Sequence, residues 1–249
     1  MDMHTVSQTP ARRPPAFRLR EADEMGDCVS ARYEYRAWFR CVPAAVASLQ
    51  HHWEFTRAER RTDIYLLSPC QPLTLAKLRG GERLEVKRLL RWAGPHQIWA
   101  IRRHGAFPLA GADMTRFAEL TGIKAQVPNL DGTDADSFLS SVMTLAARDA
   151  IEPVAVRKSR LLFTAGDCQA EITRVRSTGF QAITLAIEAD DRMSADIAVR
   201  SLNLTEQPNI AYGEALRLGV SGENDMTIGP GGPGTRTKRL ADKMKGADK

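Results

Sequence analysis

Apolar and polar residues alternate along much of the chain with a period of two, which is typical of strands with one buried face. Residues 31–40 are the clearest case, because an aromatic face with Tyr33 and Tyr35 lies opposite a polar one. That second face carries Arg32, Glu34, Arg36 and Trp38. Similar patterns predict further strands over residues 62–67, 73–79, 83–92, 97–103, 154–163, 169–176 and 181–189.

Helical spacing of apolar residues interrupts the strands in several places. It predicts helices over residues 42–53, 113–120, 134–148, 194–202 and 210–218. Gly80-Gly81 predicts a two-residue hairpin, and Gly166-Asp167 and Thr178-Gly179 predict the turns of a three-stranded meander. The sequence therefore predicts an α+β fold in which helices flank an antiparallel sheet.

The two ends of the chain differ from this patterned middle. Residues 1–30 form a polar lead-in with prolines and arginines, which we expect to be flexible. Residues 221–249 contain a run of glycine and proline at 229–234 and six lysines and arginines after residue 235, so we expect a disordered basic tail. The tail either keeps the protein soluble or makes a weak electrostatic contact with nucleic acid. The folded domain is expected over residues 31–220.

Composition narrows the function classes without choosing one. The chain has 249 residues, of which 43% are hydrophobic, and this is enough for a core. The net charge of +5 favours anionic partners such as phosphate esters, polyphosphate, nucleic acid or an acidic membrane surface. The four cysteines lack metal-ligand spacing, so we expect reduced thiols and no zinc. With neither a signal peptide nor a long apolar run, we expect a cytoplasmic protein that does not enter a membrane.

The strands carry an unusual number of cations at positions two residues apart. The pairs or alternating sets are Arg32 and Arg36 around Glu34, Lys77 with Arg79, Arg83 and Lys87 around Glu85, Lys158 with Arg160, and Arg174 with Arg176. They could form a solvated face in which opposite charges pair across strands, at about 0.2–1 kcal/mol each. Alternatively, a closed or strongly curved sheet brings them together around a cavity. Such a cavity must normally hold anions or acidic residues, because unpaired buried cations are costly, and a phosphate chain suits arginine forks.

Several short motifs follow one another in an order that resembles the CYTH, or triphosphate-tunnel, superfamily. The opening strand, Arg32-Tyr33-Glu34-Tyr35-Arg36, is similar to the family's Glu-x-Glu-x-Lys, and Thr62-Asp63-Ile64-Tyr65 is similar to its Thr-Asp-x-Tyr strand. The family's basic strands come next, and they are similar to Lys77-Leu78-Arg79, Leu84-Glu85-Val86-Lys87 and residues 154–160 of this chain. The family's last helix is similar to the segment that contains Tyr212. The resemblance implies an antiparallel β-barrel or tunnel with flanking helices over residues 31–220, and a triphosphate or polyphosphate ligand.

The same resemblance implies roles for individual residues. The ligand would be bound by Arg36, Lys77, Arg79, Lys87, Lys158, Arg160 and Arg174. Glu34 and Glu188 would be catalytic and would hold Mg²⁺ or Mn²⁺ for the hydrolysis of a phosphoanhydride bond. Further acidic candidates are Glu85, Glu171 and Asp190.

Two positions depart from the family pattern. Arg32 stands where the first glutamate is expected, and Ala186 stands where one of the last glutamate pair is expected. Exchanging a glutamate for an arginine changes the local charge by two units and repels a metal cation. Two functions therefore remain open, a metal-dependent triphosphatase and a non-catalytic module that binds polyphosphate, a nucleotide or RNA. Nucleic-acid binding by the basic strands and tail is a third, with a steep dependence on salt.

Overall fold

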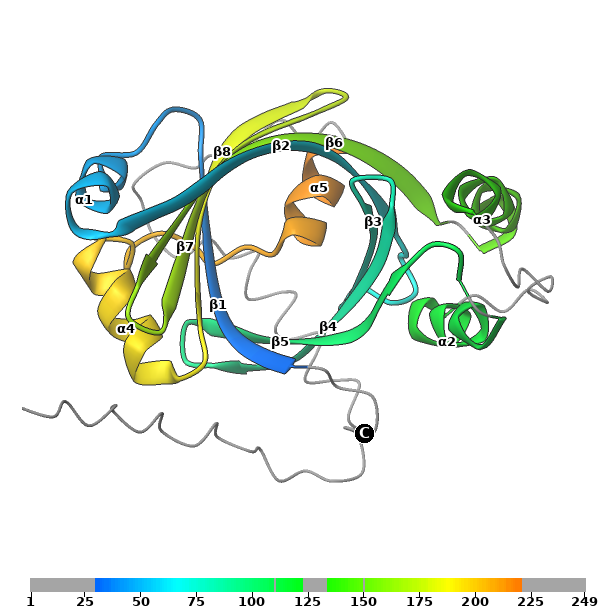
Figure 1. Ribbon diagram of the computed structural model, residues 1–249, viewed down its shortest axis with the longest axis horizontal. Coiled ribbons are helices and arrows are strands. Elements are labelled where there is room, and N and C mark those ends of the chain that lie inside the picture. The colour runs from blue at the N-terminus through cyan, green and yellow to red at the C-terminus, as the bar shows by residue number, and fades with distance from the viewer. Residues whose placement is uncertain (1–29, 110, 123–133, 150, 221–249) are drawn as a thin grey trace, which may run out of the picture.

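A closed barrel of eight antiparallel strands forms the centre of the molecule in the computed structural model, which describes residues 30–109, 111–122, 134–149 and 151–220 (Figure 1). The strands are β1 (Ser30–Phe39), β2 (Glu54–Leu67), β3 (Thr74–Arg79), β4 (Arg83–Ala93), β5 (His96–Ala106), β6 (Glu152–Ala165), β7 (Cys168–Ser177) and β8 (Phe180–Ala189). They are ordered β1-β5-β4-β3-β2-β6-β7-β8 around the ring, and β8 pairs with β1 to close it. The predicted antiparallel barrel is confirmed.

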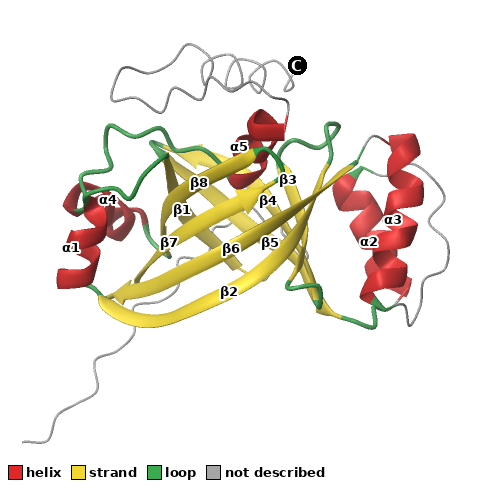
Figure 2. Cartoon of the chain, turned by 90° about the horizontal axis from the view of Figure 1, so that it is seen from above, coloured by secondary structure: helices red, strands yellow, loops and turns green. Residues whose placement is uncertain are grey.

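Helices cover the barrel on opposite sides (Figure 2). They are α1 (Ala45–His52), α2 (Gly111–Thr121), α3 (Ala135–Asp149), α4 (Arg192–Ser201) and α5 (Tyr212–Val220). The outer faces of β1, β7 and β8 pack on α1 and α4, with Tyr35, Leu185 and Val199 in that core. The outer faces of β2, β3 and β4 pack on α2 and α3 through residues such as Leu78, Phe117 and Phe138.

The predicted helices and strands are all present, but β2 and one turn differ from the prediction. β2 begins at Glu54 rather than at residue 62. Its first residues are mostly charged or exposed, so they lack the apolar alternation that marks a strand, and they are held by pairing with the C-terminal half of β6. The β3–β4 hairpin has a three-residue connection, because Arg79 pairs with Arg83; Gly80 and Gly81 both have positive φ.

The lumen of the barrel is divided into an apolar half and a charged half. Trp38, Tyr65 and Val156 point into the apolar half, where they pack with Tyr212 and Leu216 of α5. The Trp38 Nε1 donates a hydrogen bond to the Ile210 carbonyl at 2.8 Å, which ties β1 to the segment leading into α5. Helix α5 therefore closes this half of the lumen, and it is seen within the ring of strands in Figure 1.

Some predictions lie on other parts of the chain. The flexible lead-in, the basic tail and its contact with nucleic acid concern residues outside the described ones, as does Cys28. Of the described cysteines, Cys41 and Cys70 are exposed and Cys168 is buried, and all three are free. None of the helices in the described ranges is both long and apolar enough to cross a membrane.

Candidate anion-binding tunnel

The charged half of the lumen encloses a cavity of about 390 Å³. Of the described residues that line it, nine are lysines or arginines and four are glutamates. The cations are Arg32, Arg36, Arg57, Arg61, Lys77, Arg79, Lys87, Lys158 and Arg160, and the glutamates are Glu34, Glu85, Glu171 and Glu188. The period-two alternation aims these side chains inward, and over much of the ring the opposite face of the strands packs on the outer helices.

Most residues that the sequence analysis chose for the site line this cavity. Glu34, Glu188, Arg36, Lys77, Arg79, Lys87, Lys158 and Arg160 are all among them. Arg174 is the exception, since its side chain is exposed and is not among the lining residues. On β7 the inward positions are those of Glu171, Thr173 and Val175, so Arg174 lies on the outer face, and we leave it out of the site.

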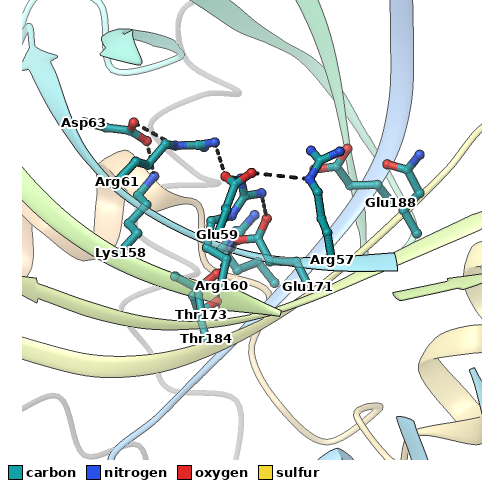
Figure 3. A network of polar contacts seen from close by, with 12 residues as sticks. Arg57, Glu59, Arg61, Asp63, Lys158, Arg160, Glu171, Thr173, Thr184 and Glu188 are labelled. Carbon is teal, nitrogen blue, oxygen red and sulfur yellow. Dashed lines mark hydrogen bonds and ion pairs between the residues drawn. The ribbon is translucent and has the colours of Figure 1, made fainter. Parts of the chain in front are cut away.

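The sequence analysis missed four charged residues, all on the inner face of β2. They are Arg57, Glu59, Arg61 and Asp63 (Figure 3). Glu59 accepts hydrogen bonds from Arg61 and Arg160 and lies 3.4 Å from the Arg57 Nε. The i, i+2 spacing of residues 57–63 is the signal that could have revealed them, had the strand been extended to Glu54.

Lys158 lies deep in the cavity, where α5 and the apolar half begin. Its Nζ lies 2.7 Å from Asp63 Oδ2 and 2.6 Å from the Tyr65 hydroxyl, and it stands 4.4 Å from the centre of the Tyr212 ring. Burial, with Lys77 close by, lowers the pKa of Lys158 to about 7 despite the ion pair with Asp63. Lys158 therefore gains or loses its proton near neutral pH.

A continuous chain of ion pairs runs along the wall from Lys158, as Figure 3 shows. It passes through Asp63 and Arg61 to Glu59 and Arg160, and ends at Glu171, which accepts from Arg160. Glu171 also accepts a hydrogen bond from the Thr173 hydroxyl at 2.7 Å and lies 3.4 Å from Arg36. Burial alone raises the pKa of Glu171, but Arg36 and Arg160 hold it well below its usual value.

The other lumen glutamates are also paired with cations. Glu34 accepts from Arg36 at 2.9 Å and lies 3.9 Å from the Lys87 Nζ. Burial raises the pKa of Glu34, but these two cations lower it by more, so Glu34 stays ionised. Glu85 is 2.5 Å from Lys77, and Glu188 is 3.6 Å from Arg32.

The lumen still carries more positive than negative charge after these pairs are counted. With Glu59, Asp63 and Asp190 added to the four lining glutamates, nine cations face seven carboxylates among the described residues, which leaves a surplus of two positive charges. Burying a cation without a counter-ion is costly. An anion entering the cavity would therefore find an excess of charged hydrogen-bond donors already fixed in place.

Tyr212 provides an unused donor at the inner end of the cavity. Its side chain is only 6% exposed and lines the cavity, yet its buried hydroxyl has no hydrogen-bond partner among the described residues. Burial raises the pKa of Tyr212, so the hydroxyl stays protonated. Tyr212 is also the first residue of α5, and Ala211 before it lines the cavity. The positive end of the helix dipole therefore lies at the cavity too.

The residues present do not fit the Mg²⁺ or Mn²⁺ that the family resemblance implies. Such ions need several free oxygen ligands. Glu34 and Glu188 are paired in register on neighbouring strands, but Arg36, Lys87 and Arg32 already engage their carboxylates. Within the part of the chain that the structure describes, no group of three or more His, Cys, Asp or Glu side chains is placed to hold a metal ion.

Comparison with known proteins gives likenesses of fold only. No protein-family model and no curated protein matches the sequence. A protein from Pyrococcus horikoshii OT3, PH1012, is 17% identical, with 73% of this chain and 98% of that chain covered and a TM-score of 0.44. A putative adenylyl cyclase from Hippeastrum with a dominant triphosphatase activity is 11% identical, with coverages of 77% and 96% and a TM-score of 0.44.

The RNA triphosphatase Pct1 of Schizosaccharomyces pombe is also similar, at 8% identity, coverages of 78% and 84% and a TM-score of 0.32. At such identities and TM-scores, however, these likenesses assign neither a family nor an activity to this chain.

Proposed function

We propose that the barrel binds a triphosphate-type anion in the charged half of its lumen. The surplus of cations over carboxylates among the residues that line the cavity is the observation that carries this proposal. The closed ring argues against a merely solvated charged face, because Arg36 and Lys158 are only 5% exposed. Guanidinium and ammonium groups from several strands could bond successive phosphates, which offer several acceptor oxygens each.

Binding can be tested by isothermal titration calorimetry on the full chain with tripolyphosphate, pyrophosphate and orthophosphate. If the cavity binds a phosphate chain, tripolyphosphate binds most tightly, pyrophosphate less tightly and orthophosphate most weakly, with a stoichiometry of one. Long single-stranded RNA serves as the comparison for the nucleic-acid alternative. Tight binding of RNA with a steep salt dependence, and none of tripolyphosphate, would replace the tunnel proposal with surface binding of a polymer.

Tyr212→Phe is predicted to weaken tripolyphosphate binding about tenfold without lowering the melting temperature. A hydrogen bond to a charged group contributes about 1.5–3 kcal/mol, whereas the removal of a buried donor that lacks a partner costs the folded protein nothing. The measurement pairs calorimetry with thermal unfolding. Tyr35→Phe is the matched control, because the Tyr35 hydroxyl donates to the Leu204 carbonyl at 2.9 Å in the core outside the barrel. Tyr35→Phe should lower the melting temperature and leave the affinity for tripolyphosphate unchanged. If Tyr212→Phe instead lowers the melting temperature and leaves the affinity unchanged, Tyr212 is not part of the site.

Binding is predicted to weaken as the pH rises from 7 to 9. Lys158 has a pKa of about 7 in the free protein, and a bound anion raises it, so binding above pH 7 requires the uptake of a proton. The fall approaches tenfold per pH unit at most. The charged or titratable groups that face Lys158 are Asp63, Tyr65, Lys77, Glu171 and Tyr212.

Lys158→Arg isolates this effect, because arginine keeps its charge throughout the range. The ionisation of the ligand itself is common to both proteins, so the difference in slope between them reports Lys158. Equal slopes for the two proteins would show that Lys158 does not titrate in this range.

Metal-dependent hydrolysis of a phosphoanhydride is the second candidate function. The observation that favours it is the register of β1 and β8, which sets Glu34 opposite Glu188 within the same cavity. Phosphate release from tripolyphosphate and ATP, with and without Mg²⁺ or Mn²⁺, tests it. Metal-dependent release that Glu34→Gln abolishes would establish an enzyme, while binding without release leaves a binding module.

A further inference from the structure

We infer that the tunnel takes the metal-free polyphosphate anion, with the Arg32 guanidinium serving as a built-in counter-charge between β1 and β8. This inference rests on the proposed function, since it specifies the ionic form of the ligand that the same cavity binds. It concerns the competition between protein cations and a divalent ion for the same anion.

Arg32 forms ion pairs with the carboxylates nearest to it. Its Nε donates to Asp190 at 2.9 Å, and its Nη1 lies 3.1 Å from the Gln169 side-chain oxygen and 3.6 Å from Glu188. The guanidinium is therefore fixed across the ends of three strands, β1, β7 and β8. The Glu188 carboxylate therefore faces the Arg32 guanidinium, which takes the place that a metal ion would need.

The remaining lumen carboxylates are held in the same way. Glu34 forms an ion pair with Arg36, Glu85 with Lys77, Glu171 with Arg160 and Asp63 with Lys158. A divalent ion would have to displace these cations to gain ligands, and it would then lie within a few ångströms of them. The donor set therefore opposes a resident metal.

The same charges favour the free anion over its magnesium complex. Bound Mg²⁺ removes two negative charges from a polyphosphate and covers some of its oxygen atoms. The surplus of positive charge in the lumen attracts the complex less strongly than the free anion. Excess Mg²⁺ should consequently compete with the protein for the ligand, whereas a site built around a metal would bind better when Mg²⁺ is added.

The experiment is calorimetry of tripolyphosphate binding to the full chain in EDTA and in excess Mg²⁺, at equal ionic strength set with sodium chloride. The inference predicts binding in EDTA and an affinity at least about fivefold lower in Mg²⁺. Affinity that stays equal or rises with Mg²⁺ would overturn it while leaving anion binding intact. Binding in neither buffer would overturn both the inference and the proposed function.

A second experiment measures metal binding in the absence of the anion. Electron paramagnetic resonance of Mn²⁺ should show no binding to the wild-type protein at millimolar concentration. Arg32→Glu releases Glu188 and adds a carboxylate two residues from Glu34, so Mn²⁺ binding should appear in that variant. Arg174→Glu makes the same charge change on the outer face and should bind no Mn²⁺. Mn²⁺ bound by the wild-type protein would contradict the inference.

Discussion

Replacement of Lys158 by methionine is expected to weaken tripolyphosphate binding by about 2 kcal/mol or more, roughly thirtyfold in Kd, when measured at pH 6. At that pH Lys158 carries its proton, because its pKa is about 7. Lys158 lies at the inner end of the lumen between Asp63 and Tyr65, where water is largely excluded and a charged hydrogen bond is strong. Calorimetry on the full chain gives the change directly.

Two further variants keep this result interpretable. Arg174→Met removes a cation from the outer face of β7, and it should change Kd by less than about twofold, because exposed charges are screened. Lys158→Arg keeps the charge and should retain most of the affinity at pH 6. If Lys158→Met folds, as judged by circular dichroism, and binds as tightly as the wild-type protein, then the anion does not reach the inner end of the lumen.

Trp38→Ala is expected to destabilise the protein by about 3–5 kcal/mol, the usual loss for truncation of a buried tryptophan. The side chain is 1% exposed and contacts the Phe180 and Tyr212 rings at centroid distances of 5.8 and 4.9 Å. Its indole N–H also holds the Ile210 carbonyl. The substitution therefore opens a cavity where the barrel meets α5, and urea unfolding measures the loss.

Trp92→Ala is the matched control for this substitution. Trp92 lies near the end of β4 and is 38% exposed, so its removal should cost clearly less than the removal of Trp38. Trp38→Ala should also weaken tripolyphosphate binding, because it loosens the segment that positions Tyr212. Equal losses of stability for the two variants would contradict the assignment of α5 as the closure of the lumen.

Local patterns in the sequence predicted most of the barrel, but they missed the first half of β2. Alternation is visible wherever one face of a strand meets a helix, as at Tyr35 or Leu185. Between Glu54 and Arg61 most side chains are exposed and the inner face is charged, so the sequence resembles that of a polar loop. Only its partner β6, about a hundred residues away, defines this segment as a strand.

The sequence predicted most residues of the candidate site, but it did not predict which carboxylate pairs with which cation. Spacing by two residues placed Lys77 with Arg79 and Lys158 with Arg160, and all four line the cavity. The same spacing suggested Arg174, which lies outward, because periodicity identifies a face without saying whether it is the inner one. Which acid pairs with which cation depends on the closure of the ring, and so the engagement of Glu188 by Arg32 could not be anticipated from sequence.

A crystal structure of the full chain grown with tripolyphosphate and EDTA would show where the anion binds. We expect a phosphate chain inside the lumen, with oxygen atoms within hydrogen-bond distance of the Lys158 Nζ and the Tyr212 hydroxyl and with Arg36 alongside. An anion held only on the outside of the barrel or by residues 221–249, with the ion pairs of the lumen intact, would contradict this expectation.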